Sequence, residues 1–220
     1  MRSNVFVAQA TGMSRRAADR VIAGGRVTVD HEQAVTGSQI EPGQIVKLDG
    51  KNIALPIKTT TILLHKPADY VSSRDGQGSR TIYDLLPPDL QHLKPVGRLD
   101  KYSSGLLLLT NDGQLAHKLT HPSFEKEKEY EVTLDRSLAD ADRQQITKTG
   151  VILEDGPSRF YLEPISDTSK RWVVRMHEGR NRQIRRTFEA LNYRVKTLHR
   201  TRFGDYKLDQ LRPGSFIHIA

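Results

Sequence analysis

The chain has 220 residues, a length that suits one medium domain or a small domain followed by a larger one. Its 34 lysines and arginines outnumber its 26 acidic residues, and the formal net charge of +8 favours a polyanionic partner, although a basic surface can also serve solubility alone. The absence of cysteine excludes disulfides and thiolate zinc sites, and with no membrane-length apolar run and no secretion signal we expect a cytoplasmic protein without a metal or cofactor.

The first fifty residues are expected to form a helix pair followed by a small sheet. Ser14 can cap a helix that ends at Gly24-Gly25, because serine is a good N-cap and glycine a good helix terminator. Residues 27–29 and 45–48 have the alternation of short strands. Residues 51–58 follow Gly50 and contain Lys51, Asn52 and Pro56, a composition that is typical of a linker.

From residue 59 onward the pattern alternates between strands and helices. The expected strands are residues 61–65, 105–110, 130–134, 172–176 and 216–219. A short helix is expected at 82–86, and Asn111 or Asp112 can cap a helix that contains Leu115 and Leu119. Strict alternation over 130–134 predicts a strand with one buried and one solvated face.

The segment 181–192 has the strongest helical pattern. Ile184, Phe188 and Leu191 fall on one stripe of a helix. The opposite arc carries three arginines, Arg182, Arg185 and Arg186. Arg185 lies nearest the edge of the apolar stripe, and we therefore expect it to turn toward the protein body.

Positive charge is concentrated near this helix. Residues 171–202 contain ten lysines and arginines against only Glu178 and Glu189. A solvated helix face normally mixes both signs, so this surplus favours a phosphate-binding surface.

The stretch Gly97–Asp100 places a carboxylate next to an apolar strand. Asp100 lies two residues from Arg98, a spacing that by itself is more typical of a surface ion pair than of an active site. Its chemistry is therefore ambiguous when it is taken alone.

Three motifs in order carry a family resemblance. They are Gly97-Arg98-Leu99-Asp100, Lys128-Glu129-Tyr130 and Glu178-Gly179-Arg180-Asn181-Arg182-Gln183-Ile184-Arg185-Arg186. Together they resemble the pseudouridine synthases that modify ribosomal RNA, and residues 1–50 resemble the S4 RNA-binding domain. The resemblance implies an α+β protein with a small S4-like domain at 1–50, a linker at 51–58 and a catalytic domain with a mixed, mainly antiparallel sheet at 59–220.

Two peripheral stretches suggest a branch of this group. Thr81–Pro88 and Leu153–Pro157 look most like the B branch of the large-subunit enzymes, which implies 23S ribosomal RNA as the substrate and a monomeric enzyme. The A branch of the small-subunit enzymes, which would act on 16S RNA, and the F branch of the large-subunit enzymes stay open, because they share the domain order.

The resemblance also implies roles for single residues. Asp100 is then the essential carboxylate, Arg185 its cationic partner, and Tyr130 the aromatic side chain that packs on the target uracil. Arg98 matches a side chain that fills the space of the flipped base. The implied pocket and RNA contacts are Lys128, Arg182, Gln183, Ile184, Arg186 and Leu198, with Arg15, Arg16 and Arg20 on the S4-like helix.

Two other functions remain possible from the sequence. A non-catalytic RNA-binding or ribosome-assembly factor could use the same fold. A nucleic-acid hydrolase with paired carboxylates is less favoured, because no second acid stands beside Asp100 and no metal motif is present.

Overall fold

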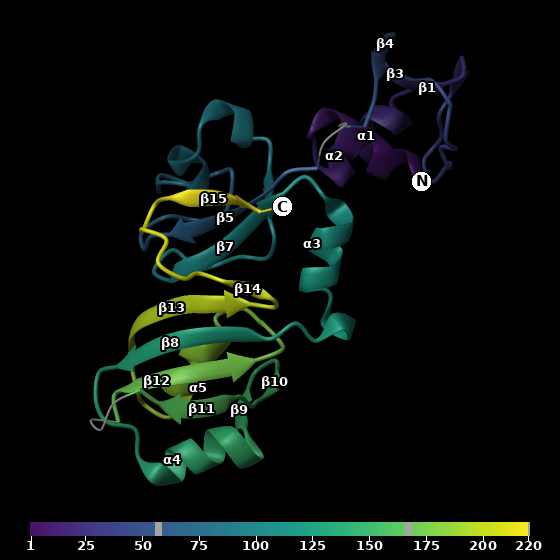
Figure 1. Ribbon diagram of the computed structural model, residues 1–220. Helices are drawn as coiled ribbons and strands as arrows, with labels where there is room; N and C mark the ends of the chain where they lie inside the picture. Colours follow the sequence, from purple (N-terminus) through teal and green to yellow (C-terminus); the bar gives the residue numbers. More distant parts are fainter. Residues whose placement is uncertain (56–58, 166–168, 220) are drawn as a thin grey trace. The chain divides into compact units, whose positions relative to one another are not determined.

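A computed structural model describes residues 1–55, 59–165 and 169–219 of the chain (Figure 1). The chain divides into two compact units, Met1–Thr59 and Thr60–Ala220. Each unit has its own hydrophobic core, and they are called unit 1 and unit 2 below.

Unit 1 is a helix pair on a four-stranded antiparallel sheet. Its helices are α1 (Ser3–Thr11) and α2 (Arg15–Ala23), and its strands are β1 (Val27–Val29), β2 (Glu32–Gln33), β3 (Val46–Leu48) and β4 (Lys51–Ile53), in the order β2-β1-β3-β4. The Ser14 hydroxyl accepts a hydrogen bond of 3.1 Å from the Ala17 amide, as expected for the cap of α2. Val7 and Ile22 pack in the core that joins the helices to the sheet.

The segment expected as a linker begins inside this sheet. Lys51–Ile53 is β4, which pairs with β3 in the register Val46↔Ile53. The polar composition of these residues concealed a strand whose backbone is paired along one edge. The linker expectation is therefore wrong for 51–53, and its last part, 56–58, lies outside the described residues.

Unit 2 is built on a nine-stranded, mainly antiparallel sheet. Its main order is β11-β12-β8-β13-β7-β5-β15, with β14 paired to β13 and β6 paired to β7. The strands are β5 (Thr61–Lys66), β6 (Lys94–Pro95), β7 (Ser104–Thr110), β8 (Lys128–Leu134), β11 (Tyr161–Pro164), β12 (Arg171–Met176), β13 (Val195–Phe203), β14 (Tyr206–Lys207) and β15 (Phe216–Ile219). The pair β7–β13 is parallel. Strands are found at all five predicted segments.

The apolar pattern of each strand agrees with its place in the sheet. Leu106–Leu109 on β7 are all buried, because one core packs on each face of this strand. On β8 the alternation buries Tyr130, Val132 and Leu134 on one face. The predicted single-sided burial of this strand is confirmed.

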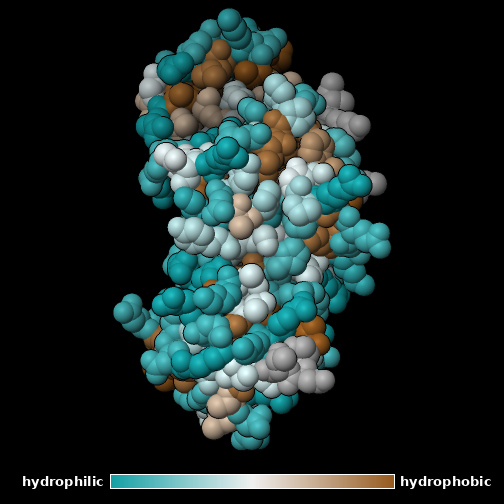
Figure 2. All heavy atoms as spheres, turned by 90° about the vertical axis from the view of Figure 1, so that its left-hand side faces the viewer, coloured by the Kyte–Doolittle hydropathy of each residue, from teal (hydrophilic) through white to brown (hydrophobic). Residues whose placement is uncertain are grey.

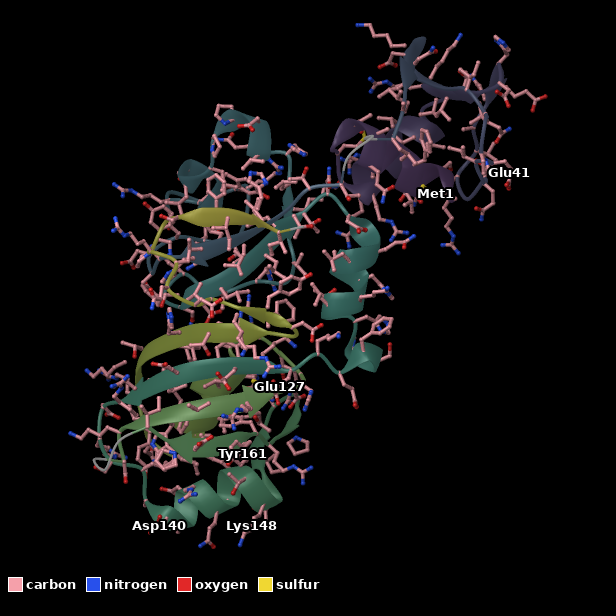
Figure 3. All side chains as sticks on the ribbon, in the orientation of Figure 1. Met1, Glu41, Glu127, Asp140, Lys148 and Tyr161 are labelled. Carbon is pink, nitrogen blue, oxygen red and sulfur yellow. The ribbon has the colours of Figure 1, made fainter. Side chains whose placement is uncertain are left out.

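Helical segments and a hairpin complete unit 2. They are η1 (Ile82–Leu85), η2 (Pro88–Leu90), α3 (Gly113–Thr120), η3 (Pro122–Phe124), α4 (Asp140–Gln144), η4 (Gln145–Thr149), α5 (Gln183–Ala190) and the strands β9 (Val151–Leu153) and β10 (Gly156–Ser158). Asp112 caps α3 through its side chain. Figure 1 shows α5 behind the sheet, and Figure 3 labels Asp140 and Lys148 on α4 and η4 and Tyr161 on β11.

Helix α5 is shorter than the predicted segment 181–192. It begins at Gln183, because Arg182 has a left-handed backbone with φ of 46°. It ends at Ala190, so Leu191 follows the helix rather than extending its stripe. The arginine at 182 consequently belongs to the loop that enters α5.

Hydrophilic residues, in teal, cover most of the face that Figure 2 shows, and hydrophobic residues, in brown, gather there in small separate areas. Among the described residues no helix is both long and apolar enough to cross a membrane.

Candidate active site

Asp100 lies in a tightly held loop between β6 and β7, which we call the Asp100 loop (residues 96–103). Gly97 has a φ of 72°, in the left-handed region that favours glycine, and it turns the chain into the loop. The Ser72 hydroxyl donates to the Leu99 carbonyl at 2.9 Å and accepts from the Leu99 amide at 3.2 Å. The residue before Asp100 is therefore fixed on both its backbone groups.

A buried lysine holds the other side of this loop. Lys66, at the end of β5, is 0% exposed, and its ammonium donates to the carbonyls of Pro67, Lys101 and Ser103 at 2.9, 3.3 and 2.6 Å. Burial lowers the pKa of Lys66 to about 8, while the Asp100 carboxylate opposes that shift. The ammonium thus ties the segment directly after Asp100 to the end of β5.

Arg185 of α5 is the cation next to Asp100. Its side chain is 7% exposed, and its Nε lies 3.5 Å from Asp100 Oδ2. The guanidinium also donates to the carbonyls of Val195 and Tyr102 and to the Ser103 hydroxyl, at 3.1, 3.2 and 3.3 Å. Burial lowers the pKa of Arg185, and the Asp100 carboxylate opposes this shift. Arg182 is a second cation, with Nη1 3.9 Å from Asp100 Oδ2.

Tyr130 and Lys128 come to the same site from β8. The two residues share strand parity, and Tyr130 is 7% exposed. The pKa of Lys128 is lowered to about 8, mainly by burial and additionally by the nearby Arg200 guanidinium. The Lys128 ammonium donates to the His177 carbonyl at 2.8 Å.

Asp100, Lys128, Tyr130 and Arg182 line one cavity of about 450 Å³ in unit 2, whereas Arg185 contacts Asp100 without being one of the lining residues. Ligand pockets in proteins span about 300–1,000 Å³, so a nucleotide-sized ligand fits this volume. The sequence-predicted residues that line it are Arg98, Asp100, Lys128, Tyr130, Arg182, Gln183, Ile184 and Leu198. Arg98 is exposed, whereas Ile184 and Leu198 are buried in the wall.

Other predicted contacts lie outside this cavity. Arg186 binds Asp155, with Nη2 2.7 Å from Oδ2, and that ion pair holds the pKa of the Asp155 carboxyl below its ordinary value. The three arginines of α2 are exposed on unit 1: Arg15, Arg16 and Arg20.

The basic surplus of residues 171–202 is largely neutralised in space. Seven of its ten cations lie within 4.0 Å of a carboxylate oxygen, namely Arg171, Arg175, Arg180, Arg182, Arg185, Arg186 and Arg202. The acids come from several elements, including β8 and the β9–β10 turn. The local count of charges therefore overstates the surface left for phosphates, since strand pairing brings distant acids to these cations.

Several residues at the site were not predicted from the sequence. Lys66 and Ser72 hold the Asp100 loop from elements more than 25 positions away in the chain, and Arg200 lines the cavity while being 2% exposed. A charged residue two positions after the apolar run 62–64 was the available signal for Lys66. Arg200 gave no signal apart from its place in a strand-like segment.

The geometry supports chemistry centred on one carboxylate. Asp100 is rigidly placed, partly exposed to the cavity and paired with a buried guanidinium. Tyr130 adds an aromatic wall. Among the described residues no group of three or more His, Cys, Asp or Glu side chains could hold a metal ion. The cavity is thus a candidate catalytic pocket built around Asp100, because Glu178, the other carboxylate on its lining, is already bound by Arg180 and Gln183.

Comparison with known families agrees with this architecture. A model described as RNA pseudouridylate synthase matches residues 60–190, which is more than half of the chain and nearly all of the pocket. The chain therefore belongs to the RNA pseudouridylate synthase family.

Relatives and a solved structure are similar over the whole chain. This chain is 36% identical over 234 aligned positions to a ribosomal large subunit pseudouridine synthase B of Xanthomonas campestris. The alignment covers all of this chain, which spans about half (47%) of that relative. The chain is 39% identical over 222 positions to a ribosomal small subunit pseudouridine synthase A of Escherichia coli K12, covering 98% of this chain and 95% of the relative. A crystal structure of a pseudouridylate synthase superposes with a TM-score of 0.73 at 30% identity, covering 100% and 96% of the two chains.

Proposed function

We propose that this protein isomerises specific uridines to pseudouridine in ribosomal RNA. The observation that carries the proposal is the Asp100 carboxylate, fixed 3.5 Å from the buried Arg185 guanidinium in a cavity walled by Tyr130. Family membership and the names of the relatives support the same activity.

The reaction moves one bond of the nucleotide. The bond from ribose C1′ to uracil N1 breaks, the free uracil rotates, C5 bonds to the same C1′, and the C5 proton is lost while N1 gains one. Atoms and electrons balance without an oxidant, a reductant or an energy source. The protein must hold a carboxylate at the ribose or base, retain the detached uracil and accept the C5 proton.

The pocket residues are suited to these tasks. Asp100 supplies the essential carboxylate, and Arg185 orients it through their ion pair. Tyr130 packs on the uracil and assists removal of the C5 proton. Ile184 and Leu198 form apolar walls that retain the base after its bond to the ribose has broken.

The target base must leave its stack to reach this pocket, at a cost of a few kcal/mol. Arg98 is exposed at the pocket rim and fills the vacated space in the RNA. Lys128, Arg182 and Gln183 complete the nucleotide contacts, whereas Arg186 acts indirectly by fixing Asp155 beside the pocket.

Unit 1 supplies RNA affinity as an S4-like domain. Its helix pair and small sheet follow the helix–sheet order of that domain, and the exposed arginines of α2 can dock on phosphates and recognise RNA shape: Arg15, Arg16 and Arg20. Unit 2, from residue 60 onward, is then the catalytic domain.

We further propose 23S ribosomal RNA as the substrate, because Thr81–Pro88 and Leu153–Pro157 look most like the B branch of the large-subunit enzymes. The test incubates the purified protein with 16S and 23S transcripts and maps pseudouridine in both. New pseudouridine in 23S RNA supports the proposal, and modification of 16S RNA alone reassigns the substrate. Binding to either RNA without any pseudouridine would indicate a non-catalytic assembly factor.

A further inference from the structure

Arg200 is a fully buried cation that has no ionic partner among the residues that the structure describes. It lies on β13 directly opposite Tyr130 of β8 and is 2% exposed. Its Nε donates to the Leu106 carbonyl at 2.8 Å, but its Nη2 is buried and has no hydrogen-bond partner in the described part of the chain. Among the described residues no carboxylate lies within 4.0 Å of this guanidinium. A buried guanidinium is normally paired, so this residue requires an explanation.

Among the other arginines around the pocket, Arg98 is exposed to solvent, and the remaining three have a carboxylate partner. Arg185 and Arg182 have Asp100, and Arg180 has Asp155 within 2.9 Å. Arg200 is thus the buried pocket cation whose charge the described residues leave uncompensated.

A second cation lies on the same wall. The Arg200 guanidinium carbon and the Lys128 ammonium lie 4.9 and 5.4 Å from the centre of the Phe203 ring. Figure 3 labels Glu127 at the start of β8, directly before Lys128. Glu178 attracts Lys128 but is already bound by Arg180 and Gln183. The two cations repel one another, which is part of why the pKa of Lys128 is lowered.

Two incompletely neutralised cations on a pocket wall are stabilised by an anion that enters with the ligand. Uracil is neutral before its bond to ribose breaks, whereas a phosphodiester is anionic throughout. The two free oxygens of a phosphodiester also match one guanidinium N–H and one ammonium. Every nucleotide in an RNA strand carries such a group on each side.

We propose that Arg200 and Lys128 form a phosphate subsite that holds a backbone phosphate adjoining the target uridine. The inference rests on the proposed function for the identity of the ligand. With the phosphate fixed at this wall, the ribose is placed toward Asp100 and the base toward Tyr130. Arg200 then acts as a substrate-positioning residue that is charged and desolvated before RNA arrives.

Binding of small probes to the full-length protein tests the subsite. Uridine, 5′-UMP, 3′-UMP and inorganic phosphate are titrated at constant ionic strength and followed by NMR. We expect at least one UMP isomer to bind about tenfold or more tightly than uridine, with inorganic phosphate competing. Equal affinity for uridine and both isomers, or no saturable UMP binding, would overturn the proposal.

Substitutions of single lysines test which side chain is responsible for the preference for UMP over uridine. Lys128→Met should reduce the preference for UMP over uridine to less than about threefold while leaving uridine affinity unchanged, because only the phosphate contact is lost. Lys126→Met is the matched control: this pocket lysine is already 3.6 Å from Asp205, so UMP affinity should change by less than about twofold. An equal loss of uridine and UMP binding in Lys128→Met contradicts the subsite.

Arg200 is tested without removing its charge. Arg200→Lys keeps a cation but withdraws Nη2, and we expect weaker UMP binding in a protein whose Trp172 fluorescence is unchanged. If this variant does not fold, the wild-type comparison of uridine with UMP still decides. Formation of pseudouridine without any UMP preference overturns the subsite alone, whereas a UMP preference in a protein that makes no pseudouridine overturns only the proposed function.

Discussion

Gly105 is a position where one added methyl group should strongly destabilise unit 2. Gly105 has a φ of 109°, and a Cβ added there would lie 2.2 Å from the Arg200 carbonyl oxygen and 2.5 Å from its nitrogen. Ordinary Cβ contacts begin near 3.4 Å, so β7 and β13 would have to separate by about 1 Å. These strands are paired only at His199↔Ser104 and Arg200↔Gly105 in the described register.

Two costs add up in Gly105→Ala. The left-handed backbone costs an alanine about 1–2 kcal/mol, and overpacking between strands costs about 1–3 kcal/mol. We therefore expect the free energy of unfolding of unit 2 to fall by about 2–5 kcal/mol. Because β13 carries Leu198 and Arg200 of the pocket, a shift of about 1 Å should also slow pseudouridine formation by about 100-fold.

Urea unfolding followed by Trp172 fluorescence measures this loss. Trp172 is the single tryptophan of the chain and is 2% exposed in the core of unit 2. Gly78→Ala is the matched control, because Gly78 has a φ of 82° with nothing within 4 Å of the added Cβ, leaving only the backbone cost. If both variants lose the same stability within about 0.5 kcal/mol, the close approach of β7 to β13 does not have the energetic role assigned to it.

Two further changes test the support of Asp100. Arg185→Lys keeps the charge but loses the planar fork that reaches Val195 and Tyr102, so kcat should fall about 10–100-fold with RNA affinity nearly unchanged; a wild-type kcat would contradict this. Lys66→Met leaves three carbonyls without their donor, and single-turnover pseudouridine formation should slow about tenfold or more; an unchanged rate would show that the ammonium does not position the loop. Because the pKa of Lys66 is about 8 when folded and about 10.5 when unfolded, the unfolded chain binds more protons between these values. The contribution of Lys66 to stability therefore rises with pH from 8 to 10.5, by at most about 1.4 kcal/mol per pH unit, and urea unfolding of Lys66→Met should lack this slope. Identical slopes in both proteins would refute the assignment.

Local patterns predicted five of the strands of unit 2, but not the central strand β13. The alternation of β8 and the apolar run of β7 each reflect the burial of a single strand, which the sequence of that strand already contains. The shortened helix α5 shows where such patterns stop being sufficient. Its stripe continues to Leu191, but the backbone at Arg182 is decided by the loop that enters the helix.

Charges were harder to interpret than apolar residues. The basic surplus of 171–202 is compensated by acids from β8 and the β9–β10 turn, and pairing of this kind depends on strand order, which no local count contains. The partner of Asp100 is an instructive case. Arg98 is near in sequence but points to the pocket rim, whereas Arg185 comes from α5, 85 positions later, and reaches the carboxylate. Sequence resemblance supplied this pairing, and helix periodicity alone only placed Arg185 toward the protein body.

The most direct test of the account is Asp100→Asn, which removes the carboxylate charge and keeps the size of the side chain. RNA binding is measured with 23S and 16S transcripts, and pseudouridine is quantified in the same samples. We predict RNA affinity within about threefold of the wild type, because the proposed RNA contacts on unit 1 and at the pocket rim remain. We also predict no pseudouridine above background. Turnover by Asp100→Asn comparable to that of the wild type would contradict the central role of this carboxylate.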